Sequence, residues 1–316
     1  MSGTVGTLSP SPDLDTLRRR LGDTARSDHP LGALTTYRVG GAAALYVEPD
    51  GEEALLEVAR ALAGLDVPVL VIGRGSNLLV ADRGFDGLVI RLGAAFERLA
   101  IEGTEVWAGA ALSLPVLARR TAAAGLHGLE WAVGVPGSVG GAIRMNAGGH
   151  GSDTAATLIG YRWVDLVTAT VEEDDAERLG FGYRHTSLRP TDVVVAAHHR
   201  LVPGDPDQGA AAIDEIVRWR RANQPGGSNA GSVFTNPPGD SSGRLIEACG
   251  LKGFRLGSAE VSPKHANFIQ ADRGGSADDV RRLIDHVRTT VEAATGVVLT
   301  TEVRLVGFAP PGTGDS

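Results

Sequence analysis

The sequence predicts an α+β protein with three domains. Helical segments and short apolar strands are mixed along the chain without a regular βαβ rhythm, and glycine-rich loops interrupt them. The length of 316 residues allows two or three domains, and 42% hydrophobic residues with a net charge of −8 describe an ordinary globular protein. No repeat of about 20–50 residues is visible, which excludes a solenoid.

The first domain is expected over residues 13–96, after a disordered tail over 1–12. A helix is expected over residues 53–64, where apolar side chains recur at helical spacing: Leu55, Val58, Ala59 and Leu62. The β-branched run 67–73 reads as a buried strand, and 87–92 as its neighbour. The turn "GRGSN" separates the two.

The second domain is expected over residues 97–204. It begins with a helix over residues 114–124 and continues into a loop-rich stretch over 130–151. Strands follow at three positions: 161–168, 169–175 and 192–201. The acidic run 172–177 reads as a solvated turn.

The third domain is expected over residues 205–308, followed by a tail over 309–316. A helix over 210–223 opens it. A second helix lies between the candidate N-cap Ser276 and the candidate C-terminal stop Gly296, and a last strand runs over 297–307.

Two glycine-rich loops are the clearest candidates for ligand binding. The first, residues 73–77, follows a strand but lacks the third glycine of a dinucleotide fingerprint, so a Rossmann site is rejected. Its main-chain N–H groups can still form an anion-binding nest, or the loop is a tight strand–strand turn. The second, residues 134–151, carries seven glycines in eighteen residues, which suits close contact with a large flat ligand bearing a pyrophosphate.

Composition excludes several classes of protein. The acidic balance argues against nucleic-acid binding. A single cysteine, Cys249, allows no internal disulfide, and no metal site is expected. No signal peptide and no apolar run long enough for a membrane span are visible, so no membrane partner is expected.

The chain resembles the UDP-N-acetylenolpyruvoylglucosamine reductase family, and more closely its shorter, second type. The resemblance covers residues 31–307 and rests on six motifs in the family's order: "TTYRVGG", "GRGSNLLV", "GVPGSVGGAIRMNAG", "FGYRHTS", "NAGSVFTNP" and "TEVRLVG". It implies two domains that form an FAD-binding unit of the vanillyl-alcohol-oxidase type and a third, substrate-binding α+β domain.

The resemblance also implies a function. NADPH would reduce a non-covalently bound FAD, and flavin N5 would pass the hydride to the β-carbon of UDP-N-acetylglucosamine enolpyruvate. Protonation of the α-carbon would give UDP-N-acetylmuramate, a peptidoglycan precursor used in cell-wall biogenesis, cell shape and cell division. A monomeric cytoplasmic enzyme is expected.

Three residues match the family's catalytic positions. Ser232 matches the proton donor, and its hydroxyl is fully protonated at neutral pH. Arg184 matches the arginine that holds the substrate carboxylate, and Glu302 the glutamate that polarises the intermediate. Taken alone, these residues read as a turn serine, an interface ion pair and a solvent-facing strand residue.

Further site residues follow from the same resemblance. Tyr183, Asn236 and His265 match positions of the UDP-sugar site. The residues expected to bind FAD lie in the first three motifs: Tyr37, Arg38, Gly73, Gly75, Ser76, Asn77, Pro136, Gly137, Ser138, Gly140, Gly141, Asn146 and Gly151.

The chain departs from the family pattern at two places. Thr235 stands where a lysine is frequent, so a phosphate contact is lost or passes to another cation such as Lys252 or Arg255. Glu302 lacks the preceding proline. Two alternatives stay open: another flavin oxidase or dehydrogenase of the same fold, tethered through His150, and a non-catalytic flavin-binding module.

Overall fold

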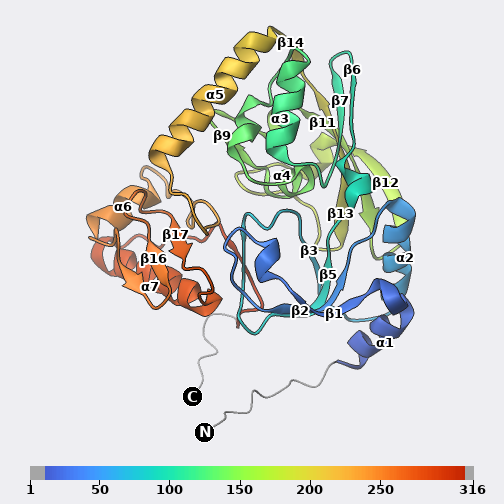
Figure 1. The fold of residues 1–316 in the computed structure, drawn as a ribbon, viewed down its shortest axis with the longest axis horizontal. Coiled ribbons are helices and arrows are strands. Elements are labelled where there is room, and N and C mark those ends of the chain that lie inside the picture. Colours follow the sequence, from blue (N-terminus) through green and yellow to red (C-terminus); the bar gives the residue numbers. More distant parts are fainter. Residues whose placement is uncertain (1–10, 310–316) are drawn as a thin grey trace.

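The computed structural model describes residues 11–309. The expected tails, 1–12 and 309–316, lie almost wholly outside these residues. Figure 1 shows three groups of elements: the N-terminal one in blue, a central one in green and the C-terminal one in orange and red. Helices and largely antiparallel sheets are mixed in them, which confirms the predicted α+β class.

The N-terminal group is a four-stranded sheet in the order β1-β2-β5-β3. Strand β1 (Arg26–Pro30) is antiparallel to β2 (Ala42–Val47), whereas β5 (Phe85–Ile90) runs parallel to β2 and to β3 (Val69–Val71). Helices α1 (Pro12–Leu21) and α2 (Glu52–Leu62) pack together beside it. The buried side chains of α2 are those that helical spacing predicted: Leu55, Val58, Ala59 and Leu62.

The central group is built on a five-stranded antiparallel sheet in the order β12-β11-β13-β7-β6. The strands are β6 (Leu99–Glu102), β7 (Glu105–Gly109), β11 (Leu158–Asp165), β12 (Thr170–Asp175) and β13 (Asp192–Arg200). Helix α4 (Val139–Met145) packs on β13, and α3 (Leu114–Ala123) contacts α5 (Pro206–Asn223). Two short pairs complete the group: β8 (Leu126–His127) with β14 (Val202–Pro203), and β9 (Gly148–Gly149) with β10 (Ser152–Asp153).

The predicted strand over residues 169–175 is confirmed by β12, so the solvated turn that was also predicted over residues 172–177 is wrong for residues 172–175. Glu172 and Glu173 pair with Trp163 and Arg162 in β11, so most of the acidic run belongs to β12. Because β12 is an edge strand, its carboxylates stay in solvent, and charge on an edge opposes pairing with other chains.

The C-terminal group follows the long helix α5, which spans from the central group toward it (Figure 1). Strands β15 (Arg255–Leu256), β16 (Ala259–Val261) and β17 (Ile269–Ala271) form a sheet that contacts α7 (Ala277–Thr295), and α6 (Ser242–Ala248) packs on α7. The side chain of Ser276 accepts a hydrogen bond from the Asp279 N–H, and Gly296 ends the helix with φ 74°. Both predicted ends of α7 are therefore confirmed.

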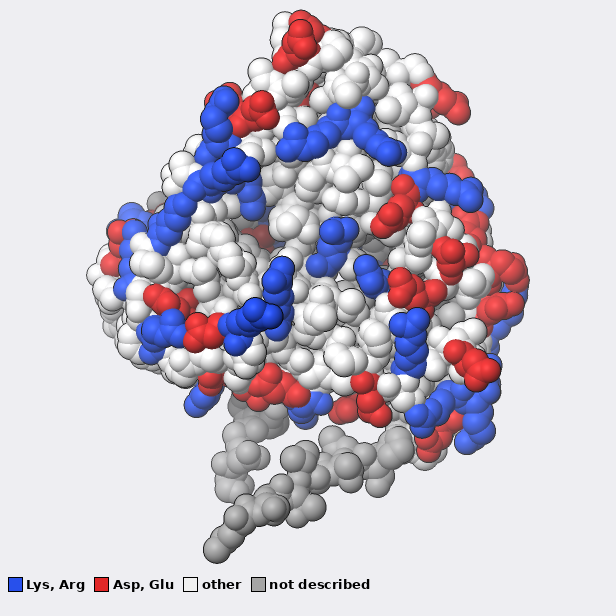
Figure 2. All heavy atoms as spheres, in the orientation of Figure 1, with Lys and Arg blue, Asp and Glu red and all other residues white. Residues whose placement is uncertain are grey.

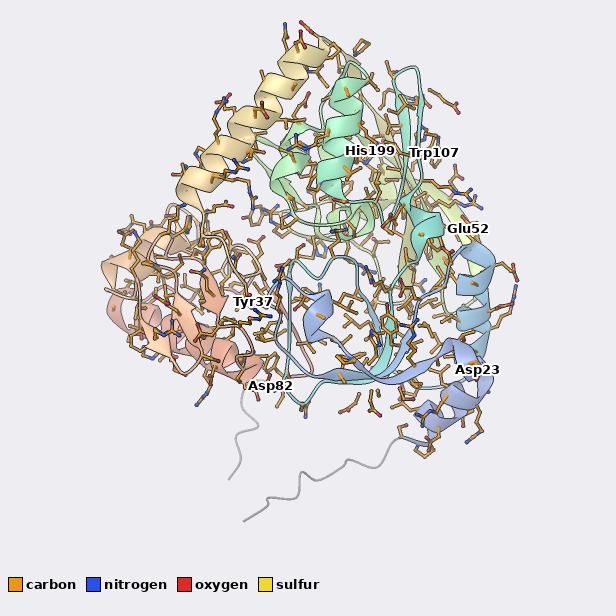
Figure 3. All side chains as sticks on the ribbon, in the orientation of Figure 1. Asp23, Tyr37, Glu52, Asp82, Trp107 and His199 are labelled. Atoms are coloured by element: carbon orange, nitrogen blue, oxygen red, sulfur yellow. The ribbon has the colours of Figure 1, made fainter. Side chains whose placement is uncertain are left out.

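The last strand returns the chain to the N-terminal group. It is shorter than the predicted 297–307, since only β18 (Arg304–Val306) pairs, in parallel with β4 (Leu78–Val80). Asp82, which follows β4, accepts hydrogen bonds from the Ala277 and Asp278 N–H groups at 2.9 and 3.2 Å. Figure 3 shows Asp82 and Tyr37 on the side of the N-terminal group that faces the C-terminal elements.

None of the helices within residues 11–309 has the length and hydropathy of a membrane-spanning segment. Over the same residues, no cluster of three His, Cys, Asp or Glu side chains is arranged to hold a metal ion.

Candidate active site

A cavity of about 750 Å³ lies where the three groups of elements meet, within the usual size range of ligand sites. Its wall is formed by both glycine loops, the segment around Arg184, the C-terminal end of α5, the loop around Ser232, and the approach to β18. The cavity therefore joins segments from nearly the whole length of the chain.

The first glycine loop presents unpaired main-chain donors. None of the five N–H groups of residues 73–77 has a protein hydrogen-bond acceptor within residues 11–309. Gly75 has φ 59°, and a Cβ there would lie 2.2 Å from the Leu34 carbonyl oxygen. Only glycine holds the loop in this position, and its N–H groups are left for a ligand.

The second glycine loop lies against the first. A Cβ on Gly73 would be 2.3 Å from the Ser138 Oγ, and Ser138 caps α4 by accepting a hydrogen bond from the Gly141 N–H. Helix α4 lies inside the stretch predicted to be loop-rich. It ends at Asn146, whose φ of 39° is left-handed.

Arg184 and Glu302 form an ion pair at the cavity wall. The Arg184 Nε donates to a Glu302 carboxylate oxygen at 2.7 Å, across 118 residues of sequence. The two other nitrogens of Arg184 donate to the carbonyl oxygens of Asn146 and Gly148 at 3.3 and 3.1 Å. Arg184 has φ 54°, a strained conformation that a non-glycine residue rarely adopts and that is often found at functional sites.

Main-chain hydrogen bonds tie Ser232 and Glu302 to the same structure. The Glu302 N–H donates to the carbonyl oxygen of Val233, the residue after Ser232, at 2.8 Å. The Asn77 side-chain amide donates to the Glu302 carbonyl oxygen at 3.1 Å. The three predicted catalytic residues all line the cavity, although they come from distant parts of the sequence.

Asn267, which no sequence motif singled out, holds the Ser232 loop. Its side-chain oxygen accepts from the Phe234 N–H at 2.9 Å, and its amide donates to the Phe234 carbonyl oxygen at 2.8 Å. Its own carbonyl oxygen accepts from the Val233 N–H at 2.9 Å. Asn267 is 4% exposed, so these bonds lie away from water and fix the loop firmly.

The wall of the cavity is strongly basic. Five arginines line it, and Glu302 is the one acidic side chain among its lining residues in the described part of the chain. Burial lowers the pKa of Arg144, and the positive charge of Arg304 lowers it further. Burial also lowers the pKa of Arg220. Figure 2 shows basic side chains in the middle of the face, whereas most acidic ones lie toward its rim. The cavity suits an anionic ligand despite the acidic chain.

Most of the expected FAD-binding residues line this cavity, namely Gly73, Gly75, Ser76, Asn77, Pro136, Gly137, Ser138 and Gly141. Five others are not among its lining residues. Tyr37 is fully buried beside Leu79 and Val233 in the C-terminal core, and burial raises the pKa of its phenol. Gly140 lines a smaller neighbouring cavity of about 100 Å³. The other three are Arg38, Asn146 and Gly151.

The three residues expected to contact the UDP-sugar do not line the cavity. Tyr183 is 66% exposed and stacks on Arg184, with its ring centre 5.2 Å from the guanidinium carbon. The Asn236 side chain accepts a hydrogen bond from the Ser242 N–H at 3.1 Å. His265 is half-buried, and burial, followed by the charge of Lys252, lowers its pKa.

The cations considered as substitutes for the missing lysine at Thr235 are committed elsewhere. Arg255 pairs with Glu260 and Asp272, and Lys252 pairs with Glu247. Neither lines the cavity. Apart from Arg184, the arginines that do line it were not found from the sequence, because arginines in separate loops share no local pattern.

The cavity fits the FAD that the sequence led us to expect. The unpaired N–H groups of residues 73–77 and the surrounding arginines suit a diphosphate. A Cβ on Gly149 would meet no atom within 4 Å, so the second loop leaves room for a bulky ring. His150, which a covalent flavin link would use, lines the cavity with its ring edge-on to Trp219 at 5.1 Å.

Known proteins resemble this chain in both sequence and structure. The family model described as "UDP-N-acetylenolpyruvoylglucosamine reductase, C-terminal domain" matches residues 223–306, and that described as "FAD binding domain" matches residues 43–173. A UDP-N-acetylenolpyruvoylglucosamine reductase from Rubrobacter xylanophilus is 43% identical over 292 residues, covering 92% of this chain and 97% of its own. One from a Synechococcus species is 44% identical, covering 88% and 92%. The crystal structure of the Thermus caldophilus enzyme matches with a TM-score of 0.79 at 35% identity, covering 89% and 99%.

Proposed function

Because the chain belongs to the UDP-N-acetylenolpyruvoylglucosamine reductase family, we propose that it uses NADPH to reduce UDP-N-acetylglucosamine enolpyruvate to UDP-N-acetylmuramate. The chain is an FAD-containing oxidoreductase of peptidoglycan precursor synthesis, as the sequence predicted. The predicted fold, an FAD-binding unit of the vanillyl-alcohol-oxidase type joined to a family-specific C-terminal domain, is also confirmed.

The residues proposed to hold FAD are those of the two glycine loops. The N–H groups of residues 73–77 would donate to its phosphates, and the small residues from Gly134 to Gly149 would lie against its rings. Reduced FAD supplies the hydride that the β-carbon of the enolpyruvyl group receives, and NADPH is the proposed source of that hydride.

Arg184 is proposed to bind the substrate carboxylate. A guanidinium has five N–H donors, and three are used by Glu302, Asn146 and Gly148, so 5 − 3 = 2 remain for the ligand. Addition of hydride to the β-carbon places negative charge on the α-carbon and its carboxylate. A fixed cation at this carboxylate lowers the barrier because it interacts more strongly with the developing charge than with the ground state.

Ser232 is proposed to give its proton to the α-carbon, which completes the saturated lactyl ether. The alkoxide that remains on Ser232 must then be reprotonated from solvent. A serine hydroxyl is a weak acid, but a carbanionic centre is basic enough to take its proton. Glu302 would orient Arg184 through the 2.7 Å ion pair and polarise the intermediate.

One observation supports this assignment above the others. The Arg184–Glu302 ion pair and the hydrogen bond from Glu302 to Val233 bring the three expected residues to one wall of a basic cavity. A turn serine, an interface ion pair and a solvent-facing strand residue would have no reason to meet there.

The test is the Ser232→Ala variant, studied by anaerobic stopped-flow absorbance. We expect NADPH to bleach its flavin at the wild-type rate, whereas reoxidation by the enolpyruvyl substrate slows by about 10²–10⁴-fold. Wild-type reoxidation would remove Ser232 from the proton transfer. Slow bleaching would instead indicate damage to the flavin site.

The remaining parts of the proposal are a non-covalent flavin, a monomer and a cytoplasmic location, with no nucleic-acid or membrane partner. Acid precipitation should release the yellow chromophore into the supernatant. A pellet that stays yellow would favour the alternative of a flavin oxidase tethered through His150. Light scattering after gel filtration measures the oligomeric state.

A further inference from the structure

The side chain of Asp82 holds the start of helix α7. Its carboxylate oxygens accept hydrogen bonds from the Ala277 and Asp278 N–H groups at 2.9 and 3.2 Å, and the Ser276 hydroxyl donates to the same carboxylate. In return, the Asp82 N–H donates to the Asp278 carboxylate at 3.4 Å. These partners lie 194–196 residues further along the chain, so the contact joins the N-terminal group of elements to the C-terminal one.

This contact adds to a helix start that its own N-cap residue already serves. The Ser276 side chain accepts from the Asp279 N–H at 3.1 Å, as the N-cap side chains of α1, α5 and α6 do at their own helices. Helix α7 receives, in addition, a carboxylate from another group of elements. Negative charge at a helix N-terminus is stabilising because it meets unpaired N–H groups and the positive end of the helix dipole. Asp82 therefore stabilises α7 in its position against the N-terminal group.

The turn that carries Asp82 is itself held on two sides. A Cβ on Gly41 would lie 2.3 Å from the Asp82 carbonyl oxygen, and a Cβ on Gly307 would lie 2.0 Å from the Gly84 carbonyl oxygen. The Gly41 N–H also donates to the Ala81 carbonyl oxygen at 2.9 Å. Because main chain packs closely on both sides of the turn, the position of the Asp82 carboxylate is fixed independently of α7.

Two separate connections lead from this part of the N-terminal group to the proposed catalytic residues. Strand β4 pairs with β18, which starts two residues after Glu302. Helix α7 leads to Ser232 by another route. It contacts β16 and β17, the segment between these two strands contains Asn267, and Asn267 holds the Ser232 loop. A loosened α7 should therefore disturb Ser232 more than Glu302.

We propose that Asp82 is a positioning residue, which holds α7, and through it the Ser232 loop, in place at the cavity wall. Asp82 does not line the cavity, so its effect on turnover must pass through the C-terminal group. The inference rests on the proposed function, because only the role of Ser232 in proton transfer makes the exact position of its loop matter for the rate.

The first test measures both half-reactions of Asp82→Ala by anaerobic stopped-flow absorbance. Bleaching of the flavin by NADPH should stay within about 2-fold of the wild-type rate, because it does not need the Ser232 hydroxyl. Reoxidation by the enolpyruvyl substrate should slow by about 5- to 30-fold, the factor that corresponds to the loss of a helix cap. Asp82→Asn should recover most of this rate, because its carboxamide oxygen still accepts from an N–H group.

Hydrogen–deuterium exchange of the FAD-loaded protein gives a second readout, which needs no substrate. In Asp82→Ala, the main-chain amides at the start of α7 and those of residues 229–236 should exchange faster than in the wild type. The amides of α2, in the N-terminal group, should exchange at the wild-type rate.

Asp50→Ala is the matched control. Asp50 is also an exposed aspartate that accepts a hydrogen bond from a remote short helix, from the Ala95 N–H at 2.6 Å, but this partner lies outside the C-terminal group. The control should keep the wild-type ratio of the two rates.

Two results would overturn the proposal: equal slowing of both half-reactions by Asp82→Ala, or faster exchange confined to α7. If Ser232→Ala slows reoxidation and Asp82→Ala does not, Asp82 has no positioning role. If neither variant slows it, the proposed function is at fault, and the exchange experiment alone decides whether Asp82 holds the Ser232 loop.

Discussion

Removal of the Asn267 side chain should loosen the loop that carries Ser232. In Asn267→Ala, the N–H and carbonyl groups of Phe234 lose their partners, and Phe234 is 1% exposed, so water cannot replace them. Each unsatisfied buried group costs about 1–3 kcal/mol, which gives a loss of about 2–6 kcal/mol in the free energy of unfolding. Even about 2 kcal/mol lowers Tm by about 3 °C at this chain length.

The same variant should also separate the two half-reactions. Flavin bleaching by NADPH does not require the Ser232 hydroxyl, so its rate should stay near that of the wild type. Reoxidation by the enolpyruvyl substrate should slow, because the serine is no longer held in place. Thermal melts and anaerobic stopped-flow absorbance measure the two effects.

Ser242→Ala is the matched control for the same loop. The Ser242 hydroxyl donates to the Thr235 carbonyl oxygen at 2.6 Å, so this variant removes one hydrogen bond instead of two. We expect about half the loss of stability and a smaller effect on reoxidation. An Asn267→Ala protein that melts within about 1 °C of the wild type would refute the reasoning. So would one that slows bleaching and reoxidation equally.

Two further predictions concern the first glycine loop and a buried histidine. Gly75→Ala should bind FAD more weakly and melt at a lower temperature, because its Cβ would lie 2.2 Å from a carbonyl oxygen. The control is Gly103→Ala, where φ is 62° but no atom lies within 4 Å of the Cβ, and its free energy of unfolding should fall by only about 1–2 kcal/mol. Thermal melts with flavin detection measure both effects. Equal losses would contradict the steric argument. Burial of His199, followed by the charge of His198, lowers its pKa to about 4. The folded state therefore favours the neutral imidazole. The resulting contribution to the free energy of unfolding is complete above the unfolded pKa of about 6.5, and it is lost as the pH falls from there toward the folded pKa. Between pH 6.5 and 4, the free energy of unfolding of the wild type should fall by about 3 kcal/mol more than that of His199→Asn, as measured by denaturant titrations. If the two proteins lost stability equally over this pH range, the argument from His199 would be refuted.

The sequence predicted those features of the fold that local pattern determines. The apolar spacing of Leu55 to Leu62 gave the buried face of α2, and Ser276 and Gly296 gave both ends of α7. Helix α4 was missed because glycines make up part of its length and a tertiary contact to Gly73 fixes its N-cap. The strand over residues 169–175 was predicted correctly, but its acidic residues were also read as a turn, because pairing with β11, and not their own propensity, makes them extended.

The residues of the candidate site also fall into those that the sequence predicted and those that it missed. Ser232, Arg184 and Glu302 were found through motifs, and the structure brings them to one cavity. Asn267 was missed because its importance depends on a partner far along the chain, a residue 33 positions away. Pattern within one segment cannot show such partners. The family motifs found the three residues only because they carry that long-range information implicitly.

The most direct test of the central claim is an anaerobic titration of the purified protein. Its flavin is reduced with one equivalent of NADPH, and UDP-N-acetylglucosamine enolpyruvate is then added without oxygen. The account predicts that the absorbance of oxidised flavin near 450 nm returns fully and that one equivalent of UDP-N-acetylmuramate forms. A flavin that stays reduced until air is admitted would contradict it.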